Sequence, residues 1–200
     1  MTEKLLINQL KTLFLLDESE EKVLREGNYS ARAEKRAIKA ISAFNNKYLS
    51  NGFNSYNSVM YCNYLYWVSR MLYVEQQGRI ADKVYYLNKT LNSVDLFYGI
   101  ELPDEWSCEH PLGTVMGRAS YGNRFFFYQG CTVGGNYHKG VLSYPQIGEN
   151  VIMYSNSKIL GDSVVGNNVV IAANTYIKGE NIPNNSVVFG QSPNLVIKER

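Results

Sequence analysis

The spacing of apolar residues divides this chain into two parts. Up to about residue 90 the apolar positions recur every three or four residues, which is the period of a helix face packed against a core. From residue 115 the interval is six residues, which matches neither an α-helix nor an ordinary β-strand. The pattern therefore predicts an all-helical N-terminal part, residues 1–92, followed by a repeat-built part, residues 93–200.

Within the helical part, local signals predict where helices begin and end. Asp17 followed by Glu20 has the spacing of a capping box, and Ser30 is the predicted N-cap of the next helix. The polar stretch 45–57 predicts a loop. Gly78 is predicted to end the helix that precedes it.

One predicted helix carries a stripe of aromatic and aliphatic side chains. Its members follow helical spacing: Tyr61, Tyr64, Leu65, Val68, Met71 and Leu72, with Trp67 beside them. Such a stripe could form a ligand platform, but at helical spacing a core or subunit contact is the favoured interpretation. One more short helix is predicted over residues 80–91.

The six-residue repeat runs through most of the second half. Its apolar positions are Val115, Tyr121, Phe127 and Val133, then Ile147, Met153, Ile159, Val165, Ile171 and Ile177. Glycine and asparagine recur between them, where tight turns use left-handed backbone conformations. Hexapeptide periodicity predicts a left-handed parallel β-helix with three hexads to a coil, and so an α+β chain. Ten hexads predict three or four coils, and residues 134–146 predict a loop that leaves the repeat.

Composition excludes several classes of protein. The chain has 200 residues, 45% of them hydrophobic, with 20 Lys and Arg against 18 Asp and Glu, so disorder is excluded and no basic stripe for nucleic acid is expected. The early apolar run, Leu13 to Leu16, is too short for a signal peptide or a membrane span. We expect a cytoplasmic protein.

The few cysteines and histidines limit the possible chemistry. Cys62, Cys108 and Cys131 form no CxxC pair, so neither a disulfide framework nor a zinc site is expected, and no metal is predicted. Cys131 occupies a small inward position of the repeat, which predicts a buried, inert thiol. Of the two histidines, His110 is a candidate base, although a lone histidine is more often a surface or core residue.

Several segments together resemble one known family. EHPLGTVMG around His110, the CTVGG turn, the YPQIGENV restart and SKILGDSVVGNNVVI are similar to the serine acetyltransferase branch of the hexapeptide-repeat acyltransferases. The resemblance covers about residues 93–198. It implies an acetyl-CoA-dependent O-acetyltransferase in which His110 is the general base and Asp95, fifteen residues upstream, orients it.

The resemblance also implies how acetyl-CoA and the oligomer are arranged. The backbone N–H groups of Gly134 and Gly135 would lie at the thioester and stabilise the oxyanion. Ser155 and Ala173 match positions that line the pantetheine groove, and Lys198 matches the tail, where it could meet a phosphate. The resemblance implies a homotrimer with sites between subunits, and pairing of two trimers into a hexamer is compatible with it.

The sequence departs from the family where the acceptor binds. Glu109 keeps the negative charge before the base, but Ser143 and Tyr144 replace an Arg-His pair that holds the carboxylate of serine. Either another cation, such as Lys139 or Arg124, compensates, or the acceptor has no carboxylate.

A sugar or surface-polysaccharide precursor is then favoured over L-serine as the acceptor, with Tyr137 and Tyr144 able to contact a pyranose ring. A non-catalytic assembly module remains the alternative from another class of protein, because repeat folds also serve as scaffolds. A three-histidine zinc site, as in the gamma carbonic anhydrases, would need more histidines than the chain has.

Overall fold

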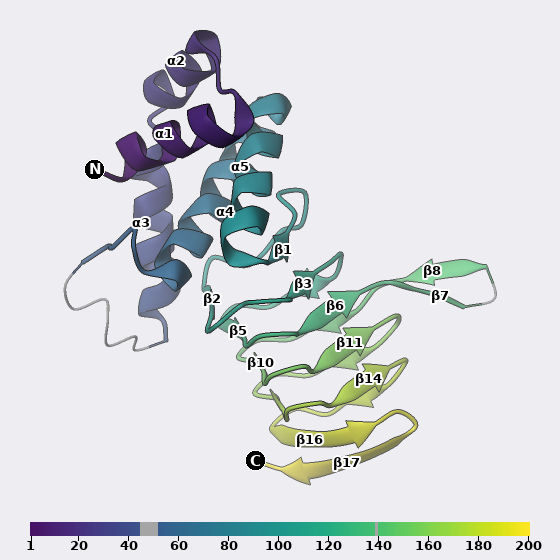
Figure 1. The fold of residues 1–200 in the computed structure, drawn as a ribbon. Coiled ribbons are helices and arrows are strands. Elements are labelled where there is room, and N and C mark those ends of the chain that lie inside the picture. The colour runs from purple at the N-terminus through teal and green to yellow at the C-terminus, as the bar shows by residue number, and fades with distance from the viewer. Residues whose placement is uncertain (45–51, 139) are drawn as a thin grey trace. The chain divides into compact units, whose positions relative to one another are not determined.

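The computed structural model describes residues 1–44, 52–138 and 140–200 (Figure 1). The chain forms two compact units. The first comprises Met1–Asn92 with Leu96–Gly99, and the second Ser93–Asp95 with Ile100–Arg200. The first unit is helical and the second is a parallel β-solenoid, as the change in apolar spacing predicted.

The helical unit contains α1 (Thr2–Phe14), α2 (Glu18–Glu26), α3 (Tyr29–Ser42), α4 (Ser58–Val74) and α5 (Gly78–Asn92). The predicted capping box is present at the start of α2, because the Asp17 side chain accepts the Glu20 N–H and the Glu20 carboxylate accepts the Asp17 N–H. Residues 45–51 of the predicted loop lie outside the described residues.

Two predicted helix ends were wrong. Asn28 is the N-cap of α3, while Ser30 lies buried inside the helix, where its hydroxyl accepts a hydrogen bond from Tyr64 at 2.9 Å. Gly78 begins α5 rather than ending α4. The chain already turns at Gln76, whose φ of +62° is left-handed, so the glycine is not needed to stop the helix.

The aromatic stripe is core, as the favoured interpretation held. Tyr64 and Tyr66 are fully buried in α4, and Trp67 is 3% exposed. Tyr61 stacks on Tyr64 with ring centroids 5.4 Å apart. The helix packs against both α3 and α5, which explains why almost its whole circumference is apolar.

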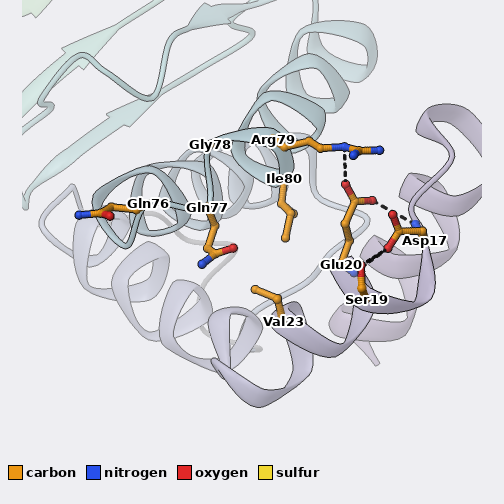
Figure 2. A pocket seen from close by; sticks show the side chains of 9 residues that line it. All are labelled: Asp17, Ser19, Glu20, Val23, Gln76, Gln77, Gly78, Arg79 and Ile80. Atoms are coloured by element: carbon orange, nitrogen blue, oxygen red, sulfur yellow. Dashed lines mark hydrogen bonds and ion pairs between the residues drawn. The ribbon is translucent and has the colours of Figure 1, made fainter.

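A pocket of about 280 Å³ lies between the start of α2 and the turn before α5 (Figure 2). Glu20 lies at one side, where its carboxylate pairs with Arg79 and Lys83.

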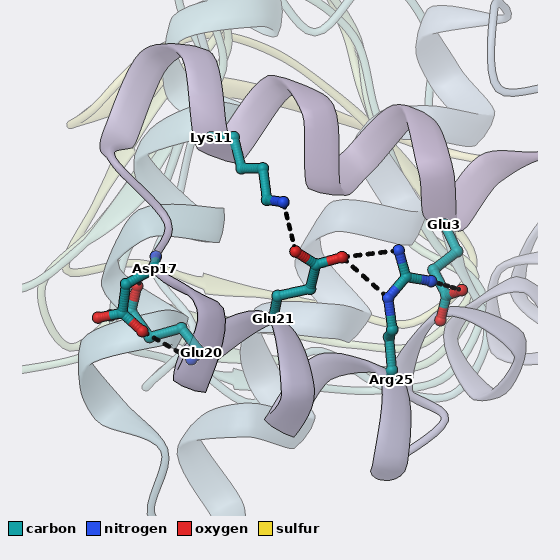
Figure 3. Close-up of polar contacts among 6 residues, drawn as sticks. All are labelled: Glu3, Lys11, Asp17, Glu20, Glu21 and Arg25. Atoms are coloured by element: carbon teal, nitrogen blue, oxygen red, sulfur yellow. Dashed lines mark hydrogen bonds and ion pairs between the residues drawn. The ribbon is translucent and has the colours of Figure 1, made fainter.

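A second polar network joins α1 to α2 on the surface (Figure 3). Here Glu21 accepts hydrogen bonds from Lys11 and Arg25, and Arg25 also pairs with Glu3 at 3.0 Å. Because these ion pairs are partly exposed, each contributes little to stability.

The solenoid is built from three columns of short parallel strands, and Figure 1 labels strands of two of these columns. The first column contains β2 (Trp106–Cys108), β5 (Phe125–Phe127), β10 (Ile152–Met153), β13 (Val170–Ile171) and β16 (Ser186–Gln191). The second contains β1 (Asp95–Leu96), β3 (Val115–Met116), β6 (Thr132–Gly134), β11 (Lys158–Leu160) and β14 (Tyr176–Lys178). The third contains β4 (Ser120–Tyr121), β9 (Gln146–Ile147), β12 (Val164–Val165) and β15 (Asn181–Ile182).

Most inward positions of the repeat are buried as predicted. Phe127, Val133, Met153, Ile159, Ile171 and Ile177 are fully buried. The first coil is the exception, because Val115 pairs with Thr132 and is 40% exposed, while Met116 pairs with Val133 and is buried. Because Val115 and Met116 are both apolar, the six-residue spacing alone assigned the inward position of this coil to Val115, one residue before the residue that is buried. The solenoid also has about five turns rather than three or four, since β2 begins a coil before His110.

Where the repeat is interrupted, the chain leaves the solenoid as an antiparallel hairpin of β7 (Asn136–His138) and β8 (Val141–Ser143). This hairpin projects sideways from β6 in Figure 1. At the C-terminal end, β17 (Asn194–Glu199) turns back antiparallel along β16. In residues 1–44, 52–138 and 140–200, no helix is long and apolar enough to cross a membrane.

Candidate active site

The turn between the first and second columns repeats down the solenoid, and its equivalent positions form two vertical rows. The backbone bonds from Glu109 N–H to Phe127 O, Tyr128 N–H to Met153 O and Tyr154 N–H to Ile171 O set this register. The first row is Glu109, Tyr128, Tyr154 and Ala172, and the second is His110, Gln129, Ser155 and Ala173. Three of the predicted site residues therefore share one row.

His110 lies on the surface in an irregular version of this turn. Six residues, 109–114, separate β2 from β3, whereas four, 128–131, separate β5 from β6, so the turn is two residues longer in the first coil. His110 is exposed and has a φ of +50°, which is uncommon for a residue other than glycine. Its carbonyl accepts the Leu112 N–H at 2.7 Å. Such backbone outliers gather at functional sites.

Asp95 lies at the other end of the same turn. Its N–H donates to Thr114 O at 2.8 Å, and Gly113 N–H donates to Ser93 O at 2.8 Å. Backbone hydrogen bonds thus connect the half-buried Asp95 to the C-terminal end of the turn 109–114, and His110 lies near the start of that turn. The structure brings the backbones of both members of the predicted dyad to one corner of the solenoid, in two successive coils.

Two stacked tyrosines lie below Glu109. The rings of Tyr128 and Tyr154 are nearly parallel, with an angle of 7° between their planes and their centroids 5.1 Å apart. Burial, followed by the nearby charge of Glu109, raises the pKa of the Tyr128 hydroxyl. The phenol consequently stays protonated and able to donate near neutral pH.

Cys131 lies on the inner side of this corner and is fully buried, as predicted. Its Sγ is 3.2 Å from Tyr154 O, and burial raises the pKa of the thiol. A buried thiol with a raised pKa has little thiolate character, so Cys131 is a poor nucleophile.

The second predicted cluster lies at the next corner, between the second and third columns. Gly134 ends β6, and Gly135 lies against Tyr144, since a Cβ at this glycine would be 2.8 Å from the tyrosine ring. The Tyr144 hydroxyl accepts a hydrogen bond from Arg118 Nη1 at 3.0 Å. The Arg118 guanidinium also lies 5.1 Å from the centre of that ring.

Within one chain, the His110 corner and the Gly134–Gly135 corner are too far apart to form one reaction centre. From Cys131, where the first corner ends, to Gly135 the backbone runs four residues along β6, about 13 Å at ~3.3 Å per residue. Acyl transfer needs reacting atoms about 3–3.5 Å apart. His110 and the Gly134–Gly135 segment therefore belong to different halves of any shared site.

The predicted acetyl-CoA residues extend down the solenoid from His110. Ser155 is half-buried and Ala173 is exposed in the His110 row. Lys198 is exposed in β17, opposite Val187 of β16. Five strand spacings separate β2 from β17 down this column, about 24 Å at ~4.8 Å each.

Arg118 is the residue that sequence reasoning missed. Of the two cations proposed to compensate for the missing arginine, Lys139 lies outside the described residues, and Arg124 lies before β5 at the third corner. Arg118 reaches Tyr144 from the coil above, a contact that spans 26 positions in sequence. Neither the hexad spacing nor the family motif signals it.

Among the described residues, no group of three or more His, Cys, Asp or Glu side chains could hold a metal ion. The pocket of Figure 2 is lined by none of the predicted site residues. The candidate site therefore rests on the two corners of the solenoid.

Comparison with known proteins adds to this picture. Residues 144–179 match the bacterial transferase hexapeptide (six repeats) family. A serine acetyltransferase of Staphylococcus epidermidis is 27% identical over 96 residues, which cover 48% of this chain and 45% of that protein. The chain therefore aligns with less than half the length of this relative.

Solved structures share the fold. The serine acetyltransferase from Vibrio cholerae superposes with a TM-score of 0.77 at 20% identity, covering 98% of this chain and 77% of that one. Serine acetyltransferase from Brucella abortus in complex with coenzyme A superposes with a TM-score of 0.65 at 18% identity, covering 92% and 73%. The chain thus contains hexapeptide repeats, and it resembles serine acetyltransferases in the sequence of these repeats and in its fold.

Proposed function

We propose that this chain is an acetyl-CoA-dependent O-acetyltransferase that transfers acetyl directly to the hydroxyl of a small acceptor. The observation that carries the proposal is the irregular turn of the first coil, where His110 has a left-handed backbone and Asp95 is attached to the same corner. An exposed imidazole at a corner that also carries a carboxylate residue is suited to general-base catalysis near neutral pH.

In the proposed reaction, Asp95 fixes the tautomer of His110 and stabilises its charged form. The imidazole takes the proton of the acceptor hydroxyl while the oxygen attacks the thioester carbonyl. The carbon–sulfur bond then breaks, and the imidazolium returns the proton to the departing thiolate. No side-chain nucleophile is required, which is consistent with the buried position of Cys131.

The donor would lie along the row below His110. Ser155 and Ala173 are small, so a pantetheine arm can pass close to the backbone there. Lys198 lies near the far end of this column, where its ammonium would meet a phosphate. The relative from Brucella abortus that shares the fold binds coenzyme A, which supports the choice of donor.

The site requires a second copy of the chain. Because β6 separates the His110 corner from Gly134 and Gly135, the oxyanion donors must come from a neighbouring subunit. In a homotrimer, one type of interface would pair the His110 corner of each subunit with the Gly134–Gly135 corner of its neighbour, which gives three sites. Association of two trimers would leave these three sites unchanged. Glu109 and the neighbouring subunit's Tyr144 would then flank the acceptor, which is L-serine or a saccharide.

Thiol release from acetyl-CoA, measured with a panel of hydroxyl acceptors, tests the proposal. We expect His110→Ala to lower kcat by about a hundredfold or more, since general-base catalysis contributes 10²–10⁴-fold. Asn181→Ala, at an exposed position of β15, is the matched control and should keep full activity. An unchanged rate in His110→Ala would exclude the proposed base, and absence of thiol release with every acceptor would favour the assembly module.

A further inference from the structure

Arg118 is held in a defined position at the corner that follows β3. Its guanidinium lies over the Tyr144 ring, and one of its N–H groups donates to the Tyr144 hydroxyl at 3.0 Å. The ring in turn packs on Gly135, at the base of the β7–β8 hairpin. Arg118 therefore contacts a coil other than its own through an aromatic anchor.

The position of Arg118 differs from its equivalents in every coil below. The pairing of Met116 with Val133, of Val133 with Ile159 and of Ile159 with Ile177 sets the register of this column. Two residues further along, the same corner position is held by Arg118, Gly135, Gly161 and Gly179. A cation thus stands once in a row that is otherwise glycine, so this charge is not part of the repeat that builds the fold.

The charge of Arg118 is not neutralised by the protein. Among the described residues no carboxylate lies within ion-pair distance of it, and the side chain is exposed. A guanidinium has five N–H donors, and Tyr144 accepts one of them. The remaining donors can bind a carboxylate through two parallel hydrogen bonds, and the aromatic anchor reduces the entropy that binding would cost.

We propose that Arg118 is a specificity-determining residue that binds a carboxylate group of the acceptor. The inference rests on the proposed function and names its substrate class, a hydroxyl compound that carries a carboxylate. Arg118 and His110 lie at opposite ends of β3, so Arg118 of one subunit serves the base of its neighbour. The cation that the sequence lacks at Ser143 and Tyr144 is then supplied from the preceding coil.

The test compares acceptors that differ only in the carboxylate. Wild type and Arg118→Ala are assayed for thiol release with serine and serinamide, and with glucuronate and glucose. We expect Arg118→Ala to raise the KM of the carboxylate acceptor at least tenfold, leaving the KM of acetyl-CoA and turnover of the neutral partner unchanged. Arg118→Lys, which keeps the charge but loses the planar fork, should lie between the two. Serine and glucuronate distinguish an amino acid from a sugar acid as the source of the carboxylate.

Two outcomes would overturn the inference: an equal loss with charged and neutral acceptors, or an unchanged KM for the charged one. Calorimetric titration of serine and glucuronate into wild type and Arg118→Ala separates the inference from the enzyme proposal. If no acceptor is turned over but carboxylate binding depends on Arg118, the proposed reaction is wrong and the carboxylate site remains. If wild type binds neither carboxylate, the Arg118 inference is wrong whatever the turnover of neutral acceptors.

Discussion

Two corners of the solenoid both contain residues with a left-handed backbone conformation, but these residues serve different purposes at the two corners. At the corner before the first column, Asn150, Asn168 and Asn185 occupy equivalent positions with φ values of +55°, +58° and +55°. Their side chains form a ladder, in which each amide donates to the next at 2.9 Å. At the corner after this column the recurring left-handed residues are Gly113, Gly130, Asn156 and Asn174, and His110 is an additional one in the first coil, where this turn is lengthened.

The contrast separates residues that build the solenoid from residues that act on a ligand. Where one residue type and one bond recur coil after coil, the recurrence satisfies the backbone and is explained by stability. Where an ionisable residue occurs once in such a row, the fold does not require it, as with His110 and Arg118.

Asp95→Asn should have the largest effect, at the chemical corner. The amide cannot stabilise an imidazolium and can hold the wrong tautomer of His110, so kcat should fall by about a hundredfold or more. Glu149→Gln is the matched control, an exposed carboxylate at the asparagine corner, and should keep its activity. Thiol-release kinetics and thermal unfolding measure both variants. Equal activities for the two would remove Asp95 from the mechanism.

Asn168→Ala, at the asparagine corner, should lower stability and leave kcat unchanged. It removes both amide hydrogen bonds of the ladder's middle member and puts a side chain with no compensating bond at a φ of +58°. We expect a loss of about 2 kcal/mol in the free energy of unfolding by urea, with kcat unchanged. Asn168→Gly loses the same bonds but tolerates the backbone, so it should lose less. A fall in kcat without a change in stability would contradict the distinction between the corners.

The sequence was most informative where side chains repeat. Buried positions such as Phe127 and Ile159 recur at a fixed interval, so the solenoid was predictable from their spacing. The first coil was missed because β2 precedes any detectable repeat and because Val115 and Met116 are both apolar.

The candidate site was predictable only in part. His110 and Asp95 stand in a local motif, which a resemblance can identify from sequence. Arg118 contacts Tyr144 in the next coil, and the β7–β8 hairpin lies between them in the sequence. The contact therefore depends on the register of the strands and not on the six-residue spacing. A contact of that kind becomes visible only when the pairing of β3 with β6 is known.

Cys131 provides the smallest expected effect and the strictest test of the contrast, because it lies inside the chemical corner. Its equivalents in other coils are Thr114, Ser157 and Thr175, all buried with a hydroxyl at the same position. Cys131→Ser should therefore cost less than about 1 kcal/mol and leave kcat unchanged.

The pH dependence of stability should still differ between Cys131→Ser and wild type. Burial raises the pKa of the folded thiol, so above the unfolded pKa of about 8.5 the unfolded chain loses a proton that the folded chain retains. Wild-type stability relative to Cys131→Ser should thus be constant below pH ~8 and fall as pH rises from there. Urea unfolding at pH 7 and pH 9.5 measures this difference. A constant difference would mean that the pKa of the folded thiol is not raised, whereas a large loss of kcat in the serine variant would mean that the interior of this corner takes part in the chemistry.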